Sequence, residues 1–142
     1  MNCLNYENGS AFNEHPLNRG RYYSKELPNA RERISMACIF IEKAYTESLT
    51  RCELSSLFGM NEDTFSRYFN RYKGIRLNDY INTLRIMHAM KLLLETDYTI
   101  TQVSIFSGFD NIRTFNRAFR KAASISPSEY RDKCAAETDS QL

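Results

Sequence analysis

The amino-acid sequence predicts an all-α fold of seven helices, and three observations lead to this prediction. Apolar residues recur at spacings of three and four along most of the chain after Pro28, which is the period of a helix with one buried side. Few stretches show the residue pattern that favours a β-strand. A segment over residues 50–80 is repeated in residue type over residues 99–130, so one short helical unit occurs twice.

The repeat is kept by residue type, and its offset grows by one after the glycine. Equivalent positions include Thr50 and Thr99, Ser55 and Ser104, Gly59 and Gly108, Phe65 and Phe115, and Arg67 and Arg117. A chain that contains two copies of one helical unit can present one surface twice. Duplex DNA offers such a chain the same groove twice, about one helical turn apart.

The chain begins with a segment that is unlike the rest. Residues 1–30 are rich in asparagine and interrupted by proline and glycine, which predicts a flexible leader too short to be a folded sensor domain. Helical periodicity starts after Pro28. The apolar stripe of this first helix consists of Ile34, Ala37, Cys38, Ile41 and Tyr45.

The first copy of the repeat predicts two short helices joined by a turn. A capping box that begins at Thr50 opens the first of them, because its side chain and the glutamate three residues later satisfy each other's backbone amides. Gly59 ends this helix, Asn61 caps the next one, and Gly74 ends that. The first helix-turn-helix unit therefore spans about residues 50–73.

Residues 77–95 predict one longer helix that links the two copies. Its apolar residues cover too much of the circumference for a surface helix. We therefore expect this linker helix to be buried between other elements.

The second copy repeats the same pattern over about residues 99–123. A capping box begins at Thr99, Gly108 forms the turn, and a helix follows over residues 111–123. A second helix-turn-helix unit is the expected structure.

The last helix is expected to be short. It begins near Ser126, and Pro127 suits its first turn. The folded part then covers residues 31–132, and the acidic segment 133–142 is predicted to be a flexible tail.

The second helix of the second copy has two contrasting faces. Its inward face, at helical spacing, consists of Phe115, Ala118, Phe119 and Ala122. Its opposite face consists of Arg113, Asn116, Arg117 and Arg120. Arginine can pair with guanine and asparagine with adenine, each contributing roughly 1–3 kcal/mol of base discrimination. Basic amphipathic helices are common, however, so this face alone leaves base reading and a solvated surface as alternatives.

The corresponding face of the first copy is less cationic. It consists of Asp63, Ser66, Arg67 and Asn70, opposite Phe65, Phe69 and Tyr72. Glu62 and Asp63 are expected to be helix-start residues that interact favourably with the helix macrodipole. The alternative is that a carboxylate accepts a hydrogen bond from a cytosine amino group. Ser66 and Arg67 are the better candidates for contact, and the second copy is expected to supply most of the electrostatic attraction.

Three segments resemble the AraC/XylS family of transcriptional regulators, and together they cover roughly residues 34–131. They read LTRCELSSLFGMNEDTFSRYFNRYKG, YINTLRIMHAMKLLLET and GFDNIRTFNRAFRKAASISPSEYR. The resemblance implies two helix-turn-helix subdomains joined by a long linker helix. It also implies that recognition helices 61–73 and 111–123 enter successive major-groove segments on one face of bent DNA.

The resemblance implies, position by position, a set of DNA contacts. Arg120 is added to this set because it lies on the same polar face of helix 111–123. The base-contacting places are Asp63, Ser66 and Arg67 in the first copy and Ile112, Arg113, Asn116 and Arg117 in the second, with Thr114 near the backbone.

The chain departs from this family at three serines. Ser55 and Ser104 stand where similar proteins usually have alanine, and a serine there is expected to bond back to the preceding turn. Ser124 stands where glycine is usual, and a left-handed helix end would be strained there by roughly 1–2 kcal/mol.

The composition argues against several other classes of protein. Nineteen basic and 17 acidic residues give a net charge of +2, too balanced to indicate nucleic-acid binding by itself. The four cysteines and two histidines lack zinc-site spacing, so no metal or cofactor is expected. No nucleophile–histidine pair or phosphate-binding glycine loop indicates an enzyme. No apolar run approaches the roughly 20 residues that span a bilayer, and no signal core is present, so we expect no membrane association and a cytoplasmic location.

The leading hypothesis is a sequence-specific regulator that binds double-stranded DNA as a monomer and also contacts RNA polymerase when it activates. No small-molecule effector domain is expected in this chain. The alternatives are a helical module that binds a protein partner, or the DNA-binding fragment of a larger or split regulator.

Overall fold

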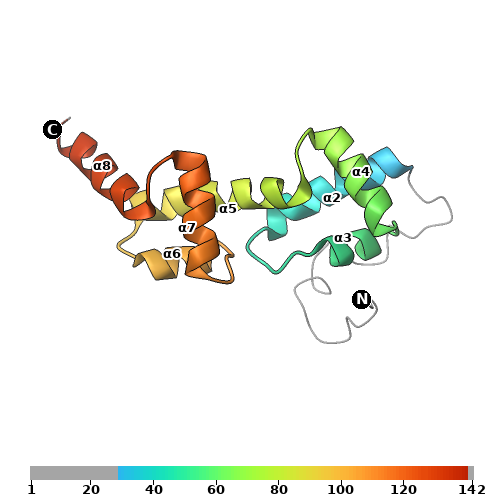
Figure 1. Ribbon diagram of the computed structural model, residues 1–142, viewed down its shortest axis with the longest axis horizontal. Helices are drawn as coiled ribbons and strands as arrows, with labels where there is room; N and C mark the ends of the chain where they lie inside the picture. The colour runs from blue at the N-terminus through green and yellow to red at the C-terminus, as the bar shows by residue number, and fades with distance from the viewer. Residues whose placement is uncertain (1–28, 141–142) are drawn as a thin grey trace. The chain divides into compact units, whose positions relative to one another are not determined.

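The computed structural model of the protein describes residues 29–140. Over this range it contains seven helices and no strand, which confirms the predicted all-α class (Figure 1). The predicted leader falls almost entirely outside the described residues. The chain divides between Asp79 and Tyr80 into two compact units.

The first unit contains α2 (Ala30–Ala44), α3 (Arg51–Leu57) and α4 (Glu62–Lys73). Both α2 and α3 pack against α4. The interior consists of fully or almost fully buried side chains from all three helices: Ile34, Ala37, Phe40, Ile41, Leu54, Phe65 and Phe69. Arg33 links α2 to the turn after α3, since its Nη1 donates to the carbonyl oxygen of Gly59 at 2.8 Å.

The second unit contains most of α5 (Leu77–Glu95), together with α6 (Ile100–Phe106), α7 (Ile112–Ala123) and α8 (Pro127–Asp139). Its core joins residues from α5, α6 and α7 and the turn between the last two: Ile86, Ala89, Leu93, Val103, Phe109, Phe115 and Phe119. The Tyr130 ring packs edge-on against Phe119 with centroids 5.5 Å apart, which ties α8 to this core.

The capping boxes expected at Thr50 and Thr99 are both present, and a third begins α8 at Ser126. In each, the side-chain oxygen of the cap accepts from the amide three residues later, and that residue's side chain accepts from the cap amide. A further box begins α2 at Asn29. Because these bonds are local in sequence, they fix the helix starts before any tertiary packing.

The linker helix α5 has the expected limits, but the expectation that it is buried all round is wrong. Ile86, Ala89 and Leu93 are buried, whereas Met87 is 62% and Leu94 55% exposed. Side chains at spacings of three and four reach the core, and their neighbours in sequence point elsewhere on the helix.

The last helix also differs from the expectation. It continues through Asp139, although the sequence predicts a flexible tail from residue 133. The extra turns contribute no buried side chain, because Pro127 is the only residue of α8 that is buried. The helix ends with a cap bond in which the Ser140 amide donates to the Ala136 carbonyl oxygen at 3.3 Å.

The two serines that replace alanine behave differently. Ser55 Oγ donates back to the Cys52 carbonyl oxygen at 3.0 Å, as expected. Ser104 Oγ is buried and has no hydrogen-bond partner within residues 29–140. The expected hydrogen bond from this serine to the preceding turn is therefore absent there, and the prediction is wrong at this position.

Candidate nucleic-acid interface

The first helix-turn-helix unit is built from α3, a tight turn and α4. Gly59 provides the turn with a φ of 63°, a left-handed conformation that glycine adopts without a side-chain clash. The amide of Met60 then donates to the Ser55 carbonyl oxygen at 2.8 Å. Asn61 caps α4 by accepting from the Asp63 amide at 2.9 Å, so the start of the helix is fixed relative to the turn.

The second unit repeats this construction with α6 and α7. Gly108 has a φ of 93°, and the Phe109 amide donates to the Ser104 carbonyl oxygen at 3.1 Å. The side-chain oxygen of Asn111 accepts from the Thr114 amide at 2.8 Å. Both units therefore hold their second helix by the same local bonds.

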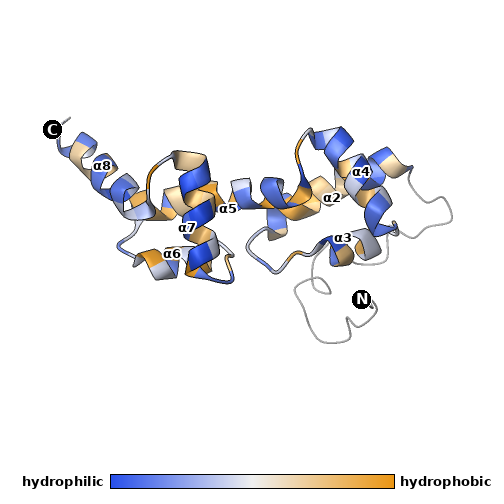
Figure 2. Ribbon diagram, in the orientation of Figure 1, coloured by the Kyte–Doolittle hydropathy of each residue, from blue (hydrophilic) through white to orange (hydrophobic). Residues whose placement is uncertain are grey.

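The buried side of α7 orients its polar side. Phe115 and Phe119 are fully buried, and Phe115 packs edge-on against Phe109 with centroids 5.3 Å apart. The rest of the helix is mostly hydrophilic, as the alternating colours along α7 indicate (Figure 2). With its phenylalanines fixed in the core, α7 presents its polar side as a rigid surface.

The predicted contact residues of α7 lie on this surface. Arg113, Asn116, Arg117 and Arg120 are all exposed, Ile112 is 38% exposed and Thr114 is half-buried. Neither Arg113 nor Arg117 forms an ion pair with a carboxylate of residues 29–140. Their guanidinium donors are available to a ligand.

A groove of about 500 Å³ lies beside this face. It is lined by Ile100, Asn116, Arg117, Arg120, Ser126, Pro127 and Ser128. Three of the predicted contact residues therefore border one concave surface together with the start of α8.

The predicted contact residues of α4 form a comparable but less cationic surface. Asp63, Arg67 and Asn70 are exposed, and Ser66 is half-buried. Glu62 is engaged in an ion pair, with its carboxylate 2.9 Å from Arg51 Nε. Glu62 therefore joins α3 to the start of α4, in line with its interpretation as a helix-start residue.

Two residues expected to face the interior do not. Ala122 is exposed, and its neighbour Ala123 packs against the core in the last turn of α7 instead. Tyr72 is 43% exposed, with its hydroxyl 3.4 Å from Ser35 Oγ on α2. Tyr72 lies at the edge where α2 crosses α4, a position that helical spacing alone does not reveal.

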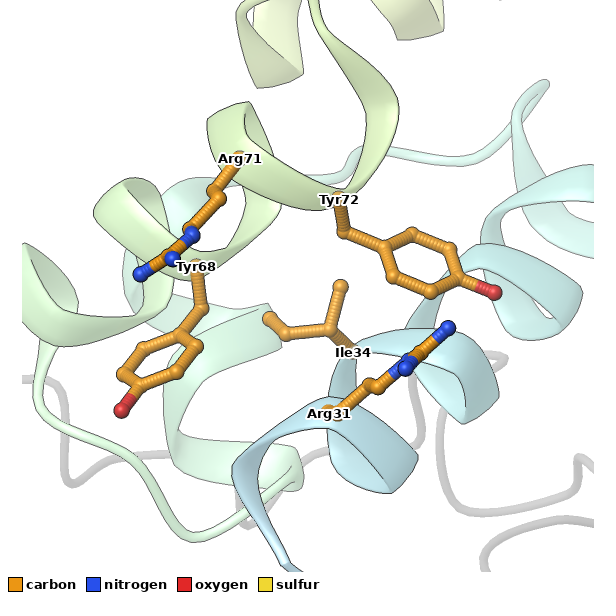
Figure 3. Close-up of a pocket in the computed structure, with 5 residues that line it drawn as sticks. All are labelled: Arg31, Ile34, Tyr68, Arg71 and Tyr72. Atoms are coloured by element: carbon orange, nitrogen blue, oxygen red, sulfur yellow. The ribbon is translucent and has the colours of Figure 1, made fainter.

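This edge contains a pocket that the sequence did not indicate. The pocket has a volume of about 410 Å³ and is lined by Arg31, Ile34, Tyr68, Arg71 and Tyr72 (Figure 3). A smaller hollow of about 200 Å³ beside it is lined by Arg67, Tyr68 and Arg71. The only sequence signal for this site is the position of Arg71, one turn after Arg67.

Neither a metal site nor a membrane span is found in the part of the chain that the structure describes. Its histidines, cysteines and carboxylates form no group of three or more able to hold a metal ion. None of its helices combines the length and the apolarity needed to cross a bilayer.

Comparison with known proteins finds relatives of one kind. A family profile described as a helix-turn-helix domain matches residues 54–133. An uncharacterised HTH-type transcriptional regulator of Staphylococcus aureus is 32% identical over 120 residues, which are 84% of this chain and 16% of that protein. The chain thus spans only about a sixth of that relative's length.

Solved structures share the fold. The C-terminal domain of the response regulator yesN from Fusobacterium nucleatum is 30% identical and superposes with a TM-score of 0.66, over 73% of this chain and 99% of that domain. The DNA-binding domain of the transcription factor AdpA, solved with its target DNA, has a TM-score of 0.70 over 74% of this chain and 95% of that domain. Its 24% identity supports the fold alone.

Proposed function

This chain belongs to the AraC-type helix-turn-helix family, and from that premise we propose that it regulates transcription by binding double-stranded DNA in a sequence-specific manner. The main support for this proposal is the exposed polar face of α7. Arg113 and Arg117 are exposed and without an ion pair among the described residues, and Asn116 lies between them on a helix fixed by its cap and its buried phenylalanines. Arginine and asparagine are the side chains best suited to reading guanine and adenine in the major groove.

The two recognition helices have different tasks in this proposal. α7 reads bases with Arg113, Asn116 and Arg117, while Thr114, at the start of the helix, contacts the sugar-phosphate backbone of the DNA. α4 enters a second major-groove segment with Ser66 and Arg67. Because only Arg67 and Arg117 are alike between the two faces, the two half-sites differ in sequence.

The roles of Asp63, Ile112 and Arg120 also belong to the proposal. Exposed Asp63 stands at a base-reading place of α4, where a carboxylate can accept from a cytosine amino group. Ile112 offers an apolar contact suited to a thymine methyl group, and Arg120 extends the cationic face along the groove beside α7.

Selection of bound duplexes from a random library tests this function. The purified chain should enrich one asymmetric sequence, and a footprint on that sequence should cover two successive major-groove segments. A variant with both Asn116 and Arg117 changed to alanine serves as the control, since it should keep the fold and lose enrichment in one half. Enrichment of no sequence by the unaltered chain contradicts the proposal.

We also propose that the chain binds as a monomer, works in the cytoplasm and contacts RNA polymerase when it activates. Two exposed apolar side chains of α6, Ile105 at 61% and Phe106 at 47%, offer a surface for a protein partner. The same residues favour the second candidate function, a helical module that binds protein and not DNA. Salt dependence separates the two, because phosphate neutralisation gives a slope of about −0.9 per contact in log K against log salt.

A further inference from the structure

We propose that the pocket between α2 and α4 holds a backbone phosphate of the bound DNA and that Arg31 and Arg71 bind this phosphate. This inference rests on the proposed function and extends it to residues outside the recognition face. The pocket is lined by Arg31, Ile34, Tyr68, Arg71 and Tyr72 (Figure 3).

The charge of the pocket is not neutralised from within the described part of the protein. Neither Arg31 nor Arg71 makes an ion pair with a carboxylate there. The nearby carboxylate of Glu32 is engaged, since it accepts from the Asn29 amide at 3.2 Å in the capping box of α2. The two guanidinium groups lie toward opposite sides of the pocket, with Ile34 between them (Figure 3), and the absence of an acid partner for either favours a ligand with negative charge.

The pocket is continuous with the base-reading face of α4. Arg67 shares the adjoining hollow with Tyr68 and Arg71, so Arg71 borders both hollows. Arg71 follows Arg67 by four residues and therefore lies about 40° further round the helix, while Tyr68 lies about 100° round. A helix in the major groove has a sugar-phosphate strand on either flank, which is where side chains at such angles point.

The other lining residues suit a nucleotide backbone better than a free ion. Tyr68 and Tyr72 are 41% and 43% exposed, and the Tyr72 hydroxyl already donates to Ser35 Oγ at 3.4 Å, so Tyr68 is the tyrosine whose hydroxyl would donate to a ligand. Tyrosine hydroxyl groups donate to phosphate oxygens, and an arginine fork can bind two of those oxygens at once. Ile34 lines the pocket but is fully buried, so the contacts to a ligand would come from the exposed arginine and tyrosine side chains.

With this phosphate site, both units contribute to the electrostatic attraction to DNA. The base-reading face of α4 is less cationic than that of α7, which had suggested that the second unit supplies most of the electrostatic attraction. With Arg31 and Arg71 on its flank, the first unit also anchors the backbone. Its contribution is to affinity and to the position of α4, and not to the choice of sequence.

Two single substitutions, Arg31→Gln and Arg71→Gln, test the pocket in the full chain. Each should lower affinity for every duplex by the same factor, on the order of tenfold at 0.1 M salt, and, because the two arginines share one phosphate, should reduce the slope of log K against log salt by up to about 0.9. Lys43→Gln is the matched control, since it removes one exposed positive charge from the same unit outside the pocket. It should leave the slope nearly unchanged, and unaltered melting temperatures establish that all three variants are folded.

Three outcomes would contradict phosphate binding in this pocket while leaving the proposed function intact. They are normal affinity and slope in both pocket variants, a loss confined to one sequence, or an equal loss in Lys43→Gln. A wild-type chain that binds no duplex at any salt concentration contradicts the proposed function itself.

Discussion

Ser124 ends α7 in the same left-handed conformation in which Gly74 ends α4, with φ values of 63° and 74°. In both helices the amide of this residue donates to the carbonyl oxygen four residues earlier, Arg120 for Ser124 and Asn70 for Gly74. Among residues 29–140 Ser124 is the only non-glycine residue with a positive φ. The strain expected from the sequence at this helix end is therefore supported by the backbone geometry.

Replacement of Ser124 by glycine should raise the free energy of unfolding by about 1 kcal/mol, because glycine has no Cβ to strain the left-handed conformation. Chemical denaturation measures the change. Gly74→Ser is the matched reversal: a Cβ at Gly74 would meet nothing within 4 Å, so only backbone strain should lower its stability. Equal stability of Ser124→Gly and the parent would show that Ser124 is not strained.

Ser104→Ala should also stabilise the protein, by about 1 kcal/mol. Its buried hydroxyl lacks a hydrogen-bond partner in the described residues, and an unsatisfied buried polar group costs roughly 1–3 kcal/mol. Ser55→Ala is the control at the equivalent position, where a bond to Cys52 would be lost. Thermal unfolding should separate the two variants, and greater destabilisation by Ser104→Ala than by Ser55→Ala would refute the explanation.

Arg131→Ala should destabilise the second unit by roughly 1.5–3 kcal/mol, the usual range for hydrogen bonds made by a charged group. Arg131 Nε donates to the Leu93 carbonyl oxygen at 3.2 Å, and Nη2 donates to the Tyr98 carbonyl oxygen at 2.7 Å. Arg131→Lys should not restore stability, because a single ammonium group lacks the fork that reaches both oxygens. Lys133→Ala, an exposed neighbour, should unfold like the parent in the same denaturation experiment.

Arg117→Ala should weaken binding to one half of the selected DNA site by about 1–3 kcal/mol and leave unrelated duplexes little changed. The reason is that a bidentate arginine discriminates between bases, whereas a phosphate contact does not. Fluorescence anisotropy with single-base variants of the site measures the effect, with Lys133→Ala as the control. An equal loss on every duplex would identify Arg117 as a phosphate contact.

The features that the sequence predicted well depend on local interactions. The caps at Asn61 and Thr99 and the left-handed end at Ser124 are set by residues within one helical turn, and all three are present. The alternation of Phe115 and Phe119 with exposed Arg117 likewise follows from helical period alone.

The features that the sequence did not reveal depend on contacts between distant segments. The pocket is lined by Arg31 of α2 and Arg71 of α4 together, and the spacing of neither helix indicates how the two helices cross. Tyr72 was expected inside for the same reason, because a helical pattern shows which side is apolar but not where its partner helix ends. The exposed Met87 and Leu94 of α5 show the converse case, an apolar sequence with too few neighbours to cover it.

The affinity ratio between a selected site and a scrambled duplex of equal length measures whether the chain recognises a DNA sequence. At physiological salt we expect a ratio of at least about 10³, with binding to both duplexes falling as salt is raised. Substitution of Asn116 and Arg117 together should reduce the ratio while largely preserving binding to the scrambled duplex. A ratio near one, or binding that does not respond to salt, would contradict sequence-specific DNA recognition by this chain.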